Sequence, residues 1–191
     1  MRKVSVDRIC YNTRPGLRNE SKLFKMAMET KAPLVLQEMC DLPLTLTEGK
    51  GIEQRLLDNR YPGAKFTVSE LEKYIRESGH IFYNRDEWSR YLLQNNFTFS
   101  VGGRFHGNMM AFSNGIPAVW IVHDERTKEL VNALKLPFMY YDALDDIDTL
   151  HDFLDICSYD AAFVYHYEKM GAAYVDFLDK NGIRHCFHNG M

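Results

Sequence analysis

The stretch SVGGRFHGNMMAFSNGIPAVWI, residues 100–121, carries the clearest structural signal in this sequence. Two glycines, an arginine, a histidine and a third glycine stand together between two apolar runs. This mixture suits the interior of neither a helix nor a strand, because glycine weakens both. We interpret it as a seam where a strand ends and a helix begins, with a second strand after the helix. In α/β proteins ligands bind at such seams, outside the carboxyl ends of the strands.

Strand-like and helix-like segments alternate on both sides of the seam. Apolar runs predict strands at residues 4–11, 32–39, 80–84, 97–103, 118–123 and 138–144, with a weaker candidate at 65–69. Helical periodicity predicts helices at residues 19–31, near 52–57, and at 69–79, 85–95, 106–114, 124–136, 145–157 and 160–181. Ser69 and Gly79 are the expected caps of the helix at 69–79. The last helix is expected to close the fold with a core-facing apolar side, and part of that side is exposed if the helix crosses to a further domain.

Alternation of this kind indicates βα units and a mostly parallel sheet. The unbroken apolar run AVWIV supports a parallel sheet, because parallel strands are covered on both faces. We therefore predict an α/β fold with a single doubly wound, mostly parallel sheet, Rossmann-like in the broad sense, that takes up residues 1–191 as one domain.

The composition limits the class of protein. The 191 residues carry a net charge of −3, which disfavours a general nucleic-acid-binding surface. The four cysteines, Cys10, Cys40, Cys157 and Cys186, form no CxxC pair, so we expect reduced thiols. The first residues lack the apolar core of a signal peptide, and no apolar run approaches the length of a membrane span. We expect a cytoplasmic protein with no transmembrane segment, and peripheral association with the inner membrane face stays open.

The residues of the seam have the chemistry of an anion site. Gly102 and Gly103 allow a ligand to approach the backbone closely, and the helix that follows presents unpaired N–H groups. Arg104 adds a planar, permanently charged fork that suits carboxylate or phosphate. His106 adds an imidazole, a side chain that can donate or accept a proton. The pattern is neither GxGxxG nor a P-loop, so neither a dinucleotide nor ATP follows from it.

The stretch VGGRFHGNMMAFSNGIPAVWIVHDERTKELVNALKLPFM, residues 101–139, resembles the signature of the polysaccharide pyruvyl transferase family. The matching positions are Gly102, Arg104, His106, Gly107, Gly115, Pro117 and Lys128. The match covers about residues 100–139, and the flanking alternation of strands and helices is compatible with it. The resemblance is to the second, C-terminal domain of a two-domain enzyme of the GT-B type, so the chain is expected to be that half alone.

The resemblance implies transfer of a pyruvyl group from phosphoenolpyruvate to hydroxyls of a polysaccharide or glycan precursor, with formation of a ketal. It implies that Arg104 holds the anionic donor, together with Gly102, Gly103 and Gly107, and that His106 is the general acid. The family also has an arginine just after the first strand of this domain. Arg8 is the better match for it, and Arg14 is the alternative. No metal or cofactor is implied, and the acceptor is a glycan or a lipid-linked sugar.

Other readings of the same residues stay open. Asn108, Arg126 and Lys128 are secondary candidates for ligand contacts, and Gln37 and Glu38 are expected near the same edge of the sheet because they end a predicted strand. The chain is alternatively a glycosyltransferase-like domain that binds a nucleotide-sugar. It is also alternatively a non-catalytic fragment that associates with a partner domain or with a second copy of itself.

Overall fold

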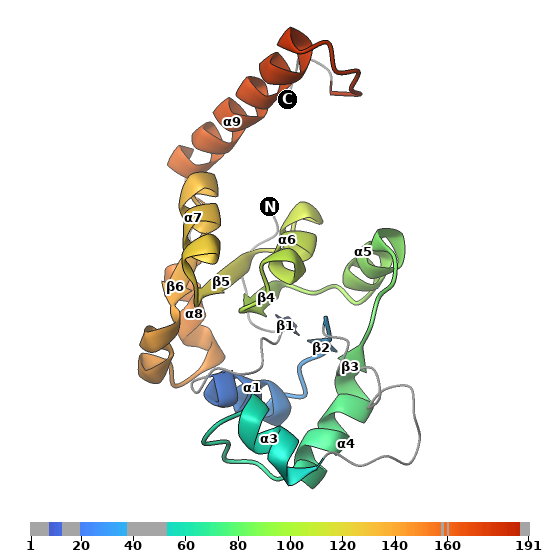
Figure 1. Ribbon diagram of the computed structural model, residues 1–191, viewed down its shortest axis with the longest axis vertical. Helices are drawn as coiled ribbons and strands as arrows, with labels where there is room; N and C mark the ends of the chain where they lie inside the picture. The colour runs from blue at the N-terminus through green and yellow to red at the C-terminus, as the bar shows by residue number, and fades with distance from the viewer. Residues whose placement is uncertain (1–7, 13–19, 38–52, 158, 160, 188–191) are drawn as a thin grey trace.

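The computed structural model describes residues 8–12, 20–37, 53–157, 159 and 161–187. Their centre is a single six-stranded, all-parallel sheet with the strand order β3-β2-β1-β4-β5-β6 (Figure 1). The strands are β1 Ile9–Asn12, β2 Leu34–Val35, β3 Gly79–His80, β4 Phe99–Gly102, β5 Ala118–Val122 and β6 Phe138–Tyr140. This arrangement confirms the predicted doubly wound, Rossmann-like α/β fold.

Side chains alternate between the two faces of the sheet, and each face packs against its own helices. One face meets α1 Glu20–Glu29, α3 Gln54–Arg60 and α4 Val68–Ser78. The other meets α5 Arg85–Gln94, α6 Phe105–Ser113 and α7 Glu125–Leu134. In β5, for example, Ile121 belongs to the first core, whereas Trp120 and Val122 belong to the second. Both faces are therefore buried, as the apolar run of β5 predicts.

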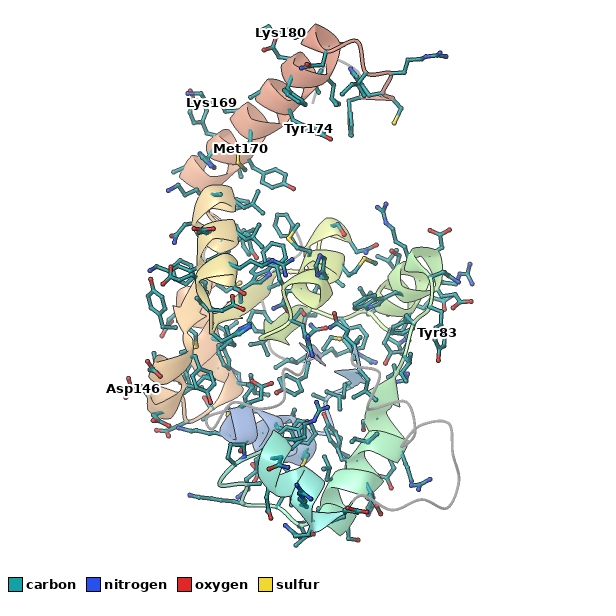
Figure 2. All side chains as sticks on the ribbon, in the orientation of Figure 1. Tyr83, Asp146, Lys169, Met170, Tyr174 and Lys180 are labelled. Carbon is teal, nitrogen blue, oxygen red and sulfur yellow. The ribbon has the colours of Figure 1, made fainter. Side chains whose placement is uncertain are left out.

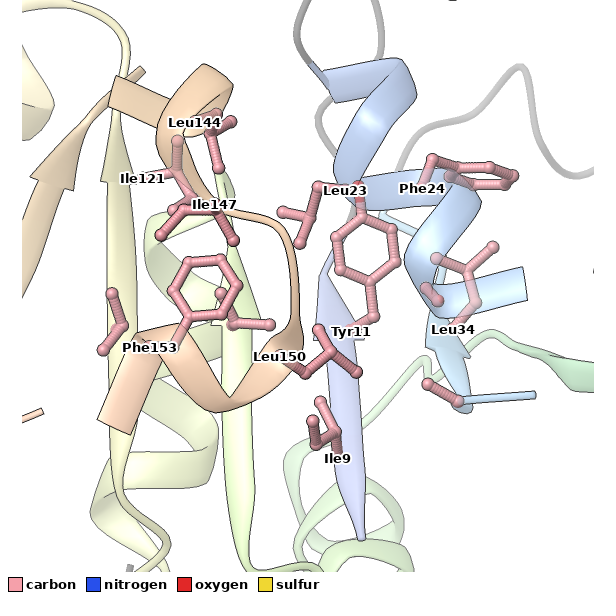
Figure 3. Packing of buried hydrophobic residues seen from close by; sticks show 14 of the residues in the cluster. Ile9, Tyr11, Leu23, Phe24, Leu34, Ile121, Leu144, Ile147, Leu150 and Phe153 are labelled. Atoms are coloured by element: carbon pink, nitrogen blue, oxygen red, sulfur yellow. The ribbon is translucent and has the colours of Figure 1, made fainter. Parts of the chain in front are cut away.

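Phe24 is the centre of the first core. Its ring lies 4.7–5.9 Å, centroid to centroid, from four other aromatic rings, those of Tyr11, Tyr61, Phe66 and Tyr74. Figure 3 shows Tyr11 of β1 beside Leu23 of α1. These contacts hold α1 against the first strand, so the chain that leaves β1 is directed to this face.

The acidic segment at 145–157 is not the continuous helix that we predicted. Residues 141–156 instead form the 3₁₀ turns η2 Tyr141–Asp146 and η3 Leu150–Asp152 and the short helix α8 Phe153–Ile156. Its buried side chains recur every third residue, which is the period of a 3₁₀ helix rather than an α-helix. They are Leu144, Ile147, Leu150 and Phe153, and they pack together against the first face (Figure 3). Asp152 also accepts hydrogen bonds from the backbone N–H groups of Asp148 and Thr149, which competes with helical pairing.

The last helix, α9 Ala161–Lys180, does not bury the apolar side that we expected to face the core. Phe163 and Leu178 are its buried residues, whereas Tyr165, Tyr174 and Phe177 are 68%, 55% and 55% exposed. His166 reaches the carbonyl oxygen of Ala133 near the end of α7, and the helix then projects past the sheet (Figures 1 and 2). The prediction was wrong because periodicity reports an apolar side but not whether a surface lies opposite it. Among the described residues, no helix is both long and apolar enough to cross a bilayer.

The start of α4 differs from the sequence prediction by two residues. Residues 65–69 form no strand, and Thr67 rather than Ser69 caps the helix. The Thr67 hydroxyl accepts a hydrogen bond from the backbone N–H of Glu70 at 3.2 Å, and the Glu70 carboxylate accepts one from the backbone N–H of Thr67 at 2.7 Å. The backbone N–H and the hydroxyl of Thr67, which both donate to the Glu70 carboxylate, lower the pKa of Glu70.

Thr67→Ala is expected to lower the free energy of unfolding by about 1 kcal/mol, because it removes one half of this capping box. Ser69→Ala, at the residue that the sequence alone favoured, is expected to change it by less than about 0.5 kcal/mol, as other surface substitutions do. Urea unfolding followed by circular dichroism measures both. Equal losses in the two variants would contradict the cap at Thr67.

Candidate functional site

The strand order reverses between β1 and β4, and this is where ligands bind in sheets of this kind. The two strands are neighbours, and their last residues, Asn12 and Gly102, are paired in register. The helices that follow them lie on opposite faces, because α1 packs in the first core and α6 in the second. The predicted seam at residues 100–121 therefore sits at the switch point of the sheet.

Two glycines allow α6 to approach β1 closely. A Cβ on Gly102, whose φ is +150°, would lie 1.9 Å from the carbonyl oxygen of Asn12. A Cβ on Gly107 would lie 2.1 Å from Asn12 Oδ1. No real side chain tolerates such distances, so both positions require glycine. Gly103, between them, is buried. The primary role of Gly102 and Gly107 is therefore to let α6 pack closely on β1.

The amino end of α6 lacks the cap that other helices of this chain have. Thr67, Asn84 and Asp124 cap α4, α5 and α7 with their side chains, whereas Arg104 occupies this position in α6 without a capping hydrogen bond. Within the described part of the chain, the backbone N–H groups of residues 105–107 donate no hydrogen bond, and the first turn of α6 has no acidic residue. The partial positive charge of this helix end is therefore available to an anion.

The two principal candidates lie together at this end. Arg104 is the N-cap residue and is half-buried, and His106 is the second residue of the helix and is exposed. The backbone of Phe105, between them, is fixed to the sheet, because the indole N–H of Trp120 in β5 donates to its carbonyl oxygen at 3.2 Å. A fixed cation and an exposed, titratable ring thus share one helical turn with the unpaired N–H groups.

A buried network of amides holds α6 to the sheet. Asn108 is fully buried, and its Nδ2 donates to the carbonyl oxygens of Gly102 at 2.9 Å and Val119 at 3.2 Å. Its Oδ1 accepts from Ser100 Oγ at 2.8 Å and from Asn12 Nδ2 at 3.1 Å. Asn12 Nδ2 also donates to Ser100 Oγ at 2.9 Å. The side chain of Asn108 therefore ties α6 to β1, β4 and β5 at once.

The interpretation of Asn108 as a residue that contacts a ligand is therefore wrong. Its two N–H donors and both lone pairs of its amide oxygen are used inside the protein, so nothing is left for a ligand. Sequence reasoning also missed Asn12 and Ser100 as members of this network. The available signal was weak: a single polar residue within FTFSV and another at the end of ICYN.

Arg8 does not lie where the resemblance puts the second donor-binding arginine. It precedes β1, its backbone N–H donates to Thr98 Oγ1, and it lines a cavity of about 340 Å³ at the amino ends of the strands with Lys31 and Phe97. Arg104 follows the carboxyl end of β4. In a parallel sheet these are opposite edges, so the structure does not bring Arg8 and Arg104 together in one site. Arg14, the alternative, lies outside the described residues, as does Glu38.

The remaining cations are at the same edge as Arg104 but belong to α7. Arg126 and Lys128 lie in its first turn, where Asp124 already caps the helix by accepting from the N–H of Thr127 at 2.7 Å. Lys128 donates to Glu125 at 3.2 Å, and this interaction raises the pKa of Lys128. These two side chains therefore stay secondary candidates.

Two other classes of chemistry find little support in the described residues. Burial raises the pKa of Cys10 and Cys157 to about 12, so neither thiol is ionised at neutral pH. Across the described ranges, no group of three His, Cys, Asp or Glu side chains is placed to hold a metal ion.

The two helical glycines at positions 107 and 171 make a matched pair for substitution. Gly107→Ala is expected to lower the free energy of unfolding by roughly 2 kcal/mol, because the new Cβ collides with Asn12. Gly171→Ala, in the exposed part of α9 with open space around it, is expected to raise it by about 0.5–1 kcal/mol. Thermal and urea unfolding measure both. A Gly107→Ala chain as stable as the wild type would disprove the close approach of α6 to β1.

Searches against family models, curated proteins and solved structures find no match to this chain.

Proposed function

We propose that this chain binds phosphoenolpyruvate at the amino end of α6 and transfers its pyruvyl group to hydroxyls of a glycan, as a polysaccharide pyruvyltransferase does. One observation carries the proposal: the uncapped amino end of α6 at the switch point of the sheet, with Arg104 and His106 in the same turn. The resemblance of residues 100–139 to that family is the second support. The reaction would take place in the cytoplasm, with a glycan or lipid-linked sugar as acceptor.

The donor has the charge that this helix end favours. Phosphoenolpyruvate carries a phosphate and a carboxylate on the same carbon atom, so it needs several N–H donors and a cation close together. The backbone N–H groups of residues 105–107 suit the phosphate, because a helix amino end combines directed donors with partial positive charge. Arg104 adds two parallel donors and a full charge, which strengthens binding to either group.

The proposed reaction needs one proton donor. His106 gives its proton to the methylene carbon of the donor, which becomes a methyl group and leaves cationic character on the neighbouring carbon. A sugar hydroxyl bonds to that carbon and loses its proton, and phosphate leaves with the electron pair of its C–O bond. A second hydroxyl of the same sugar then adds and loses its proton, which closes the ketal. One hydroxyl proton restores His106 and the other is taken up by phosphate, so no oxidant or reductant is needed.

The position of His106 is compatible with this role. Its side chain is exposed in the first turn of α6, next to the N–H groups that would hold the donor. A bound phosphate close to the imidazole would favour the protonated ring, which is the form that the first step requires. General acid catalysis of this kind contributes about 10²–10⁴-fold to a rate.

Arg104→Ala is expected to weaken phosphoenolpyruvate binding by about 10-fold or more, because it removes charged hydrogen bonds to the donor. Arg8→Ala, at the opposite edge of the sheet, is expected to leave the affinity unchanged and is the matched control. His106→Gln is expected to change affinity by less than about threefold while abolishing phosphate release in the presence of acceptor, because acid catalysis and not binding is lost. Isothermal calorimetry and a phosphate assay measure these effects.

Two results would overturn the proposal. In the first, the folded wild-type chain fails to bind phosphoenolpyruvate. In the second, Arg8→Ala and Arg104→Ala weaken binding equally, which would move the donor away from α6. Saturable binding of a uridine diphosphate sugar, with no binding of phosphoenolpyruvate, would favour the glycosyltransferase-like alternative instead.

A further inference from the structure

Gln37 reaches the first turn of α6 from another strand of the sheet. It stands two residues after β2, and its side chain is half-buried. Its Nε2 donates to Asn12 Oδ1 at 3.3 Å and lies 2.5 Å from the point that a Cβ on residue 107 would occupy. The glycine at 107 therefore leaves space for this amide beside the N–H groups of the helix end. Arg104 and His106 come from the segment after β4 instead, and Arg126 and Lys128 from the segment after β5.

The orientation of the Gln37 amide follows from a chain of hydrogen bonds that begins at the backbone. The carbonyl oxygens of Gly102 and Val119 can only accept, so the nitrogen of Asn108 must face them and its oxygen must face Asn12. The nitrogen of Asn12 therefore faces Asn108, and its oxygen faces Gln37. Gln37 must therefore donate to that oxygen from its own side-chain nitrogen. Each amide in the chain is thus fixed by the one before it.

This orientation leaves the second N–H of Gln37 Nε2 for another partner. Within the described residues, the amide of Gln37 makes one hydrogen bond, to Asn12. The group that lies against the helix end is its nitrogen, which adds a fixed, neutral donor to those of Arg104 and the backbone. A neutral donor that is held in one direction recognises the geometry of an anion as well as its charge.

We infer that Gln37 is a specificity-determining residue: its side-chain N–H donates a hydrogen bond to the carboxylate of phosphoenolpyruvate, while the amino end of α6 holds the phosphate. The inference rests on the proposed function. It names the ligand class of the site as a phosphate ester with a carboxylate on the same carbon, rather than phosphate esters in general. It also gives the buried amides of Asn108 and Asn12 a role at the site, because they fix the direction in which the side-chain N–H of Gln37 points.

The first experiment follows the Gln37 side chain directly in the wild-type chain. In ¹⁵N-labelled protein, the side-chain NH₂ signals of Gln37 are assigned by their loss in Gln37→Met. Phosphoenolpyruvate is expected to shift these signals together with the backbone amides of residues 105–107. Inorganic phosphate, which has no carboxylate, is expected to shift the backbone amides alone.

The second experiment measures affinity by calorimetry. Gln37→Met keeps the length of the side chain and removes the donor, so it is expected to weaken phosphoenolpyruvate binding about tenfold and phosphate binding less than about twofold. Gln94→Met, at an exposed glutamine at the end of α5, is the matched control and is expected to change neither affinity. Circular dichroism confirms that both variants fold.

The outcomes separate this inference from the proposed function. If phosphoenolpyruvate binds and shifts residues 105–107 but leaves the Gln37 amide and the Gln37→Met affinity unchanged, the inference is wrong and the proposed function stands. Equal losses for phosphoenolpyruvate and phosphate in Gln37→Met would overturn the assignment to the carboxylate. If the wild-type chain binds phosphate but not phosphoenolpyruvate, or binds neither, both the inference and the proposed function fail.

Discussion

The four hydrogen bonds of the Asn108 side chain are the constraint on which the candidate site depends. They tie the first turn of α6 to three adjacent strands, and they are buried, so breaking one would leave a polar group without a partner. Gly102 and Gly107 are required for the same reason, because any side chain there would push α6 away from Asn12. The position of Arg104 and His106 is therefore set by buried contacts between α6 and the sheet.

The same constraint gives the helix end its electrostatic character. The polar side chains close to the first turn of α6 form the buried amide network instead of capping it, so the N–H groups of residues 105–107 keep their capacity to bind an anion. The amino end of α7 differs, since the carboxylate of Asp124 caps it by accepting from the backbone N–H of Thr127. Two neighbouring helices at one edge of the sheet thus differ in whether a side chain caps their amino ends.

The two faces of the sheet serve different purposes. The first face carries a large aromatic core around Phe24. Residues 141–156 pack on the same face, and together these contacts bury that side of the sheet. The second carries α6 and hence the candidate site. It also carries the start of α9 through Phe163, which packs near Phe112 and Tyr159. Tyr167, one turn further along α9, still contacts the rings of Phe112 and Phe163. Beyond it Tyr174 and Phe177 are exposed, so the rest of this helix contributes little to the core that supports the site.

The alternation of strands and helices, the parallel sheet and the position of the seam could be predicted from the amino-acid sequence, because apolar periodicity and glycine placement are local properties. The sequence also identified Arg104 and His106 as neighbours, since only Phe105 separates them along the chain and one helical turn holds both. Only the tertiary structure decided that Arg8 and Arg104 lie at opposite edges, that Asn108 is turned inward, and that Asn12 and Gln37 meet α6. Those contacts depend on strand order and register, which bring together residues 25 to 96 positions apart. No local sequence pattern records which strands will be neighbours.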